Sequence, residues 1–131
     1  MALGKIKADT LEHSTAGSLD TSYVVRGSAK TWQVWDGTGS SLSDSVNTSS
    51  LTDNGTADYT MSYSSSFSSV NYTHGGNAAH SSNSTAMYDV QAKEKSVILT
   101  GSIRLAMLYS TTSSAAAEYP YGCNVSDGDL A

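Results

Sequence analysis

Four aspartates between residues 36 and 58 are the side chains best placed for chemistry in this sequence. They are Asp36, Asp44, Asp53 and Asp58. Two carboxylates held roughly 5 to 10 Å apart in a cleft can hydrolyse a glycosidic bond. Aspartates beside Gly and Asn more often form turns, however, and a chain of 131 residues has little room for a deep cleft. The sequence also shows no Gly-rich phosphate loop, nucleophile elbow or Cys/His pair, so we predict that the protein is not an enzyme.

Two histidines and one further aspartate raise the question of a metal site. His74 and His80 lie six residues apart, and Asp89 follows downstream. This spacing matches no known ligand motif, and the nearby residues are polar. We therefore expect a solvated loop here, with no metal and no cofactor.

Aromatic side chains close to Asn, Asp and Ser suggest a sugar-binding surface. An aromatic face can stack on a pyranose ring while polar neighbours bind its hydroxyls. The candidate residues are Trp35, Tyr63, Tyr72, Tyr119 and Tyr121. The alternative is that they are core or interface anchors in a domain with few aliphatic residues, and the sequence leaves both interpretations open.

The framework that must position these residues is clearest in residues 27–63. A β period over residues 30–36 places Trp32 and Val34 on one face and Trp35 on the other. We assign Trp32 and Val34 to the core, together with Tyr59 and Met61, which alternate with polar residues in a later segment. The DGTG run at residues 36–39 should end the first strand, and the Asn-Gly at residues 54–55 predicts a second turn.

Further alternation predicts the remaining strands. It falls at residues 70–74, stopped by Gly75 and Gly76, and at residues 86–92, 97–109 and 118–125, with a bend at Gly101. A helix over residues 102–109 is the competing prediction. The last strand should carry Tyr119, Tyr121, Cys123 and Val125 on one face, with Cys123 packed as a small apolar residue. About seven strands with polar turns favour an all-β fold, an antiparallel β-sandwich or jelly roll.

Composition narrows the class further. Leu, Ile, Val and Phe make up about 16% of the chain and Ser and Thr about 30%, which suits β-rich surfaces but leaves little aliphatic core. The shortage suggests that copies of the chain complete the core as a homo-oligomer. The net charge is −5 and the Lys and Arg residues are scattered, so we expect no nucleic-acid partner. No apolar run is long enough to insert in a membrane and no signal peptide is visible, so we expect a soluble protein made in a cytoplasm.

Residues 1–26 differ from the rest of the chain. Isolated apolar residues are spread there among charged ones: Leu3, Ile6, Leu11 and Leu19. We interpret this segment as an arm that docks on a neighbouring subunit or another protein, with a short helix over residues 5–13 possible, and residues 27–131 as the β-sandwich domain. The alternative is a frayed terminus.

Several motifs resemble a small domain of tailed bacteriophages, of the kind labelled tail fibre protein. They are GSAK at residues 27–30 followed by Trp32, DGTG at 36–39, LTDNGT at 51–56, DYT at 58–60 and GDLA at 128–131, with STAGSLDT at 14–21 upstream. The resemblance spans the chain, although Trp35 stands where Phe is expected.

The resemblance implies a virion structural protein. It would be a homotrimer, a fibre, appendage or tip domain that projects from the particle, is joined to other virion proteins by the arm before residue 27 and is placed to contact the host surface. A fibre usually carries repeats or a coiled shaft, which this sequence does not show, so a capsid-decorating or head-knob protein is the first alternative. A lectin-like module that binds host surface polysaccharide is the second.

Overall fold

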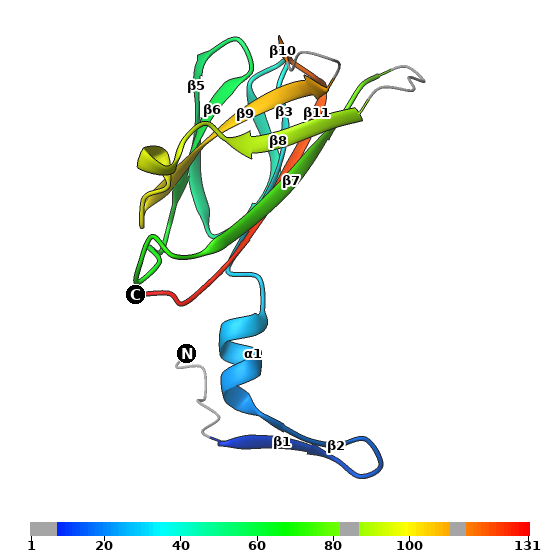
Figure 1. The fold of residues 1–131 in the computed structure, drawn as a ribbon, viewed down its shortest axis with the longest axis vertical. Helices are drawn as coiled ribbons and strands as arrows, with labels where there is room; N and C mark the ends of the chain where they lie inside the picture. Colours follow the sequence, from blue (N-terminus) through cyan, green and yellow to red (C-terminus); the bar gives the residue numbers. More distant parts are fainter. Residues whose placement is uncertain (1–7, 82–86, 111–114) are drawn as a thin grey trace, which may run out of the picture.

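The computed structural model describes residues 8–81, 87–110 and 115–131. Within them, nine strands form a single sheet that curls into a nearly closed barrel, and a separate hairpin and helix form an arm below it (Figure 1). The strands of the barrel are β3 (Thr31–Asp36), β4 (Ser41–Val46), β5 (Thr48–Gly55), β6 (Asp58–Tyr63), β7 (Thr73–Ala79), β8 (Met87–Ala92), β9 (Ser102–Ser110), β10 (Ala115–Ala116) and β11 (Tyr121–Asp127). A short 3-10 helix, η1 (Lys95–Val97), precedes β9. The prediction of an all-β antiparallel domain with an arm is confirmed.

The order of the strands explains the barrel shape. Neighbours follow the path β4-β3-β11-β7-β8-β9-β6-β5, all antiparallel, and β10 pairs with β9. The two ends of this path, β4 and β5, are consecutive in the chain and joined at Asn47, which has φ 55°. The Asn47 side chain fixes this corner: its Nδ2 donates to the Ser65 carbonyl at 2.9 Å, and its Oδ1 accepts from the Ser65 N–H at 2.7 Å. The sheet therefore curls until its two edge strands meet.

The core fills the barrel from within one chain. Trp35, Tyr59, Met61, Ile103, Leu105 and Met107 are all fully buried. The ring centroids of Trp35 and Tyr59 lie 6.0 Å apart, and Phe67 stacks on Tyr72 at 4.1 Å at the end nearer the C-terminus. Tyr59 and Met61 are thus core residues, as the sequence predicted, and Phe67 is buried as the anchor of its loop.

The inward face of β3 is the opposite of the predicted one. Trp35 is buried, whereas Trp32 and Val34 face outward and are half-buried, so their assignment as core anchors is wrong. A period of two separates the faces of a strand but does not say which is inside. The partner strand decides it: Gly122 of β11 lies opposite Trp35, and a Cβ there would stand 2.7 Å from the Trp35 ring. Only a glycine leaves room for the indole inside.

The same reversal applies to β11. Gly122, Asn124 and Ser126 point into the barrel, while Tyr121 and Val125 are exposed on the outside, so Tyr119, Tyr121, Cys123 and Val125 do not share a buried face. The inward polar side chains are satisfied largely by one another. Asn124 Nδ2 donates to Gln33 Oε1 at 3.1 Å, and Gln33 Nε2 donates to Thr48 Oγ1 at 2.9 Å.

Two strand boundaries also differ from the prediction. β7 continues through Gly75 and Gly76 to Ala79, because both glycines pair with β11 and neither needs the left-handed region. β9 is a strand rather than the competing helix, and it buries Ile103, Leu105 and Met107. Leu99 is exposed and lies outside β9.

The arm consists of the hairpin of β1 (Thr10–His13) and β2 (Gly17–Asp20), followed by α1 (Thr21–Gly27). The helix considered over residues 5–13 is wrong for its described part, since β1 occupies it. Asp20 caps α1 instead, by accepting from the Ser22 N–H at 2.7 Å. Figure 1 shows the arm extending away from the barrel, and α1 ends at Gly27, the residue at which we expected the β domain to begin.

The two tryptophans provide a matched test of the inverted face of β3. We expect Trp35→Ala to lower the free energy of unfolding by about 3 to 5 kcal/mol, because it empties the centre of the core. Trp32→Ala should cost about 1 kcal/mol or less, since Trp32 lies on the outside. Urea unfolding monitored by circular dichroism measures both, and a larger loss for Trp32→Ala would contradict the assignment.

Candidate functional site

The outward side chains of β4, β3, β11 and β7 form the main candidate site, which we call the outer face. Residues that lie opposite one another on adjacent strands form rows across this face. Val46 pairs with Trp32, Trp32 with Val125, and Val125 with Gly75. The next row runs through Asp44, Val34, Cys123 and Asn77. Val46 and Val125 are each 45% exposed, so an apolar row crosses four strands in contact with solvent.

A groove of about 340 Å³ is hollowed in this face. Its walls come from the three strands β3, β7 and β11, and its lining residues are Trp32, Gln33, Val34, Gly75, Gly76, Asn77, Cys123, Asn124 and Val125. Gly75 forms the open part: a Cβ built there would meet no atom within 4 Å. A glycine inside a strand weakens the strand because it has no side chain to pack. Such a glycine often marks a place where another molecule can approach the backbone.

The charged side chains on the strands that form and flank the groove are all acidic, and Lys30 directly precedes β3. The five strands β3, β4, β7, β8 and β11, all described, carry Asp36, Asp44, Asp89 and Asp127 but no Lys or Arg. The Asp36 carboxylate accepts from the Thr38 hydroxyl and from the N–H groups of Thr38 and Gly39, and these hydrogen bonds lower its pKa. The strands of the outer face therefore carry an apolar row with acidic side chains around it.

Cys123 lies half-buried on the outer face. Its Sγ donates to Asn77 Oδ1 at 2.9 Å, so it is not packed as a purely apolar residue. A hydrogen bond with Cys123 also raises the pKa of the neighbouring Tyr121.

The predicted sugar-binding aromatics are mostly inside the barrel. Trp35, Tyr63, Tyr72 and Tyr119 are all buried, so their faces are not available to a glycan. Burial raises the pKa of the three tyrosine hydroxyls. Tyr121, which is 42% exposed, remains on the surface. The sequence missed Trp32 as the surface aromatic, and the Gly75-Gly76 pair in a strand was the signal that could have found the groove.

The aspartates considered for catalysis have structural partners. The Asp53 carboxylate accepts from the Ser40 hydroxyl at 2.6 Å and from the Gly55 N–H at 2.8 Å, and these hydrogen bonds lower its pKa. The bond from Gly55 shapes the β5-β6 turn. Asp36 caps the turn after β3. Both act as turn-forming residues, which is the role the sequence favoured.

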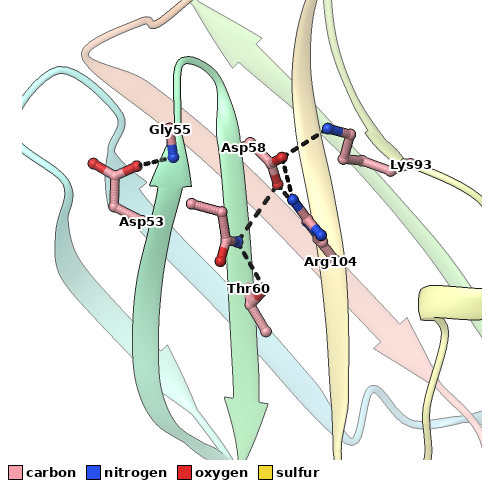
Figure 2. Close-up of polar contacts among 7 residues, drawn as sticks. Asp53, Gly55, Asp58, Thr60, Lys93 and Arg104 are labelled. Carbon is pink, nitrogen blue, oxygen red and sulfur yellow. Dashed lines mark hydrogen bonds and ion pairs between the residues drawn. The ribbon is translucent and has the colours of Figure 1, made fainter.

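Asp58 is the centre of a charged cluster on β6 (Figure 2). Arg104 of β9 donates to both its oxygens at 2.7 Å, and Lys93 donates to Oδ2 at 2.7 Å. The hydrogen bonds from Arg104, then from Lys93, lower the pKa of Asp58 to about 2. A carboxylate held ionised by two cations is unsuited to act as a general acid, and it ties β6 to β9 and to the segment after β8.

Neither histidine takes part in a metal-ligating cluster among the described residues, which contain no group of three His, Cys, Asp or Glu side chains close enough to hold an ion. His74 lies in β7 and His80 just after it, where His80 stacks near Tyr88 at 6.0 Å.

The arm presents uncovered apolar side chains. Leu11 and Leu19 pair across the hairpin and are 49% and 47% exposed. On α1, Tyr23, Val24 and Val25 are also exposed. Leu3 and Ile6, the other predicted arm residues, lie outside the described residues.

Among the helices that are described, none has the length and apolar character to cross a membrane.

Comparison of the chain with protein-family models, curated proteins and solved structures finds no match. The class of this protein therefore has to be argued from the barrel, the outer face and the arm.

The Asp58 cluster generates a prediction about pH. Its folded pKa of about 2 lies below the ordinary value of 3.8, so the cluster stabilises the fold above pH 4 and loses this effect as the pH falls toward 2. We expect Asp58→Asn to lower the free energy of unfolding by about 1 to 2 kcal/mol at pH 7. The loss is no larger because Lys93 and Arg104 are partly exposed, so water screens their attraction to Asp58.

Urea unfolding at pH 7, 4 and 3 measures this effect. The difference between wild type and Asp58→Asn should shrink with falling pH, whereas Asp44→Asn, at an exposed carboxylate on β4, should change stability little at any pH. A difference that is constant with pH would argue against the ionised cluster.

Proposed function

We propose that this chain is a structural protein of a tailed-bacteriophage particle, an appendage or tip whose barrel projects while its arm joins the assembly. The motifs shared with tail fibre domains support this proposal. So does the arm itself, which is the observation that carries it. Five apolar side chains of the arm, Leu11, Leu19, Tyr23, Val24 and Val25, are exposed on a hairpin and helix that stand clear of the barrel.

An exposed apolar segment of this kind favours docking on another protein. Burying apolar surface is worth about 25 cal/mol per Å², and an isolated two-stranded hairpin with a seven-residue helix has little stability of its own. The arm thus gains most when a partner covers it. Its role in this proposal is assembly and contact, without catalytic turnover.

We include self-association as a homotrimer in the proposal, but the copies would not share one hydrophobic core. The barrel of a single chain already encloses its own aromatic and aliphatic core. Copies would therefore meet through the arm and the exposed surfaces rather than by completing each other's interior.

Two alternatives remain distinct from the appendage. A capsid-decorating protein would use the same barrel and arm on the head. A lectin-like module would need exposed aromatics, and of the five predicted ones only Tyr121 is exposed, with Trp32 half-buried on the same outer face. The location of the protein on the particle distinguishes a capsid-decorating protein from an appendage. Binding to a glycan array distinguishes a lectin-like module from both.

Immunogold labelling tests the proposed function. Antibodies against the purified protein should label tailed particles whose genome encodes this chain, at the tail for an appendage or over the head for a decorating protein. Particles that package normally but carry neither label nor the protein by mass spectrometry would reject a virion role.

The arm can be tested in the same particles. Tyr23→Ser together with Val25→Ser should reduce incorporation of the protein by at least tenfold, because it removes two exposed apolar contacts. Val70→Ser, at a 46% exposed valine in the loop between β6 and β7, is the matched control and should be incorporated normally. Equal incorporation of both variants would contradict attachment through the arm.

A further inference from the structure

We propose that Asn54 is a site of spontaneous covalent modification, where the chain deamidates itself through the backbone of Gly55 and places a new carboxylate beside Asp58. This inference goes beyond the proposed function and does not depend on it. The reaction needs no enzyme, and its only co-reactants are water and hydroxide.

The sequence contains a single Asn-Gly pair, at residues 54–55. The backbone nitrogen that follows an asparagine can attack the side-chain carbonyl when the two approach closely, and a glycine leaves that approach open because it has no Cβ. The other five asparagines are followed by residues with side chains, namely Thr48, Tyr72, Ala78, Ser84 and Val125. Asn54 is therefore the asparagine with the least hindered nitrogen.

The position of Asn54 in the hairpin also favours the reaction. Asp53 pairs with Tyr59 and Gly55 pairs with Asp58, so Asn54 is the extra residue of a bulge in β5. Asn54 and Gly55 are exposed, and a Cβ built at Gly55 would meet no atom within 4 Å. Since β5 is also an end strand of the sheet path, the backbone can rotate here without disturbing the core.

The reaction proceeds in two balanced steps. The Gly55 amide nitrogen loses its proton to hydroxide and attacks Asn54 Cγ, which forms an N–Cγ bond. The Cγ–Nδ2 bond breaks, and Nδ2 takes a proton from water and leaves as ammonia, which restores the hydroxide. Water then opens the five-membered imide at either carbonyl and gives aspartate or isoaspartate at position 54.

Three hydrogen bonds at the end of the hairpin must open before the ring closes (Figure 2). Asn54 Nδ2 donates to Thr60 Oγ1 at 2.9 Å and to Asp58 Oδ1 at 3.5 Å, and the Gly55 N–H donates to Asp53 Oδ1 at 2.8 Å. Breaking them uncovers no apolar core residue, so a local opening of the hairpin end is sufficient.

Asp36-Gly37 provides a contrast within the same chain, because an Asp-Gly pair can form the same imide by losing water. Gly37 is buried, and its N–H donates to the Tyr119 carbonyl at 2.9 Å. The Asp36 carboxylate is also held by the Thr38 hydroxyl at 2.7 Å. Closing the ring there would require the end of the barrel to unfold, so residue 36 should stay unmodified.

The product acts on the charged cluster of Asp58. The charged groups around position 54 are Asp53 on β5, Asp58 on β6, Arg104 on β9 and Lys93 just after β8. A carboxylate in place of the donating amide repels Asp58 and competes for its two cations. The modification therefore weakens the tie between β6 and β9.

Incubation of the full-length protein at pH 8, followed by peptide mapping with mass spectrometry, tests the reaction. The peptide that contains residue 54 should gain about 1 Da, contain isoaspartate, and react at least fivefold faster than any other asparagine peptide. Asn54→Gln is the matched control: it keeps the amide but must close a larger ring, so its rate should be at least tenfold lower.

Urea unfolding of Asn54→Asp tests the effect on the cluster. At pH 7 its midpoint should lie below that of the wild type, whereas the midpoint of Asn54→Gln should not change. The difference should shrink at pH 3, because the added carboxylate, with an ordinary pKa of about 3.9, becomes protonated. Asp58, with its pKa of about 2, is still ionised at that pH.

Three results would overturn the proposal. The site is wrong if residue 54 gains no mass, or if other asparagines react equally fast. Isoaspartate at residue 36 formed at the same rate as at residue 54 would contradict the protection by burial on which the contrast depends. An unchanged midpoint for Asn54→Asp at pH 7 would reject the effect on Asp58.

Discussion

The contact between the Trp35 indole and the bare backbone of Gly122 is the constraint on which this barrel depends. It fixes the inward face of β3, and with it the direction in which every other side chain of β3 and β11 points. Trp35 reaches the centre of the core and packs on Tyr59, whose hydroxyl donates to the Gly37 carbonyl at 2.8 Å. Burial of Tyr59 raises its pKa to about 12, which keeps that hydroxyl a neutral donor. One aromatic residue thereby connects β3, the following turn, β6 and β11.

The same choice produces both the polar interior and the apolar exterior of these strands. Because Trp35 is inside, Thr31 and Gln33 must be inside as well, and they are accommodated by hydrogen bonds to Thr48 and Asn124. Trp32 and Val34 are correspondingly outside, where they form the outer face. Trp32 lies half-buried on the outside of the barrel because Trp35, three residues along the same strand, is buried inside.

Sequence reasoning predicted what depends on local patterning and missed what depends on the partner strand. Alternation identified β3, β6 and β9, and the turn residues Asp36 and Asp53 were placed in their roles because Asx turns are made within a few residues. The inward faces of β3 and β11 were reversed, since that choice was set by Gly122 and Trp35, 87 residues apart. The Asp58 cluster was missed for a related reason: its partner Arg104 comes from β9, and no local pattern joins them.

The meeting of β4 and β5 has a consequence for how this molecule opens. These strands are the two ends of the sheet path, and no ladder of backbone hydrogen bonds joins them. Side chains link them instead: the Thr48 hydroxyl donates to the Val46 carbonyl at 3.4 Å beside the corner at Asn47, and the Ser40 hydroxyl, just before β4, donates to the Asp53 carboxylate of β5 at 2.6 Å. Separating β4 from β5 would break no pair of hydrogen-bonded strands. The barrel therefore opens locally between them, at this seam, with the lowest free-energy cost. Amide hydrogens along it should exchange with solvent by a fast local route, while those of β9 and β11, paired on both sides, should exchange only when the whole sheet unfolds. The barrel would then respond to force or heat as a curled sheet that uncurls at one seam.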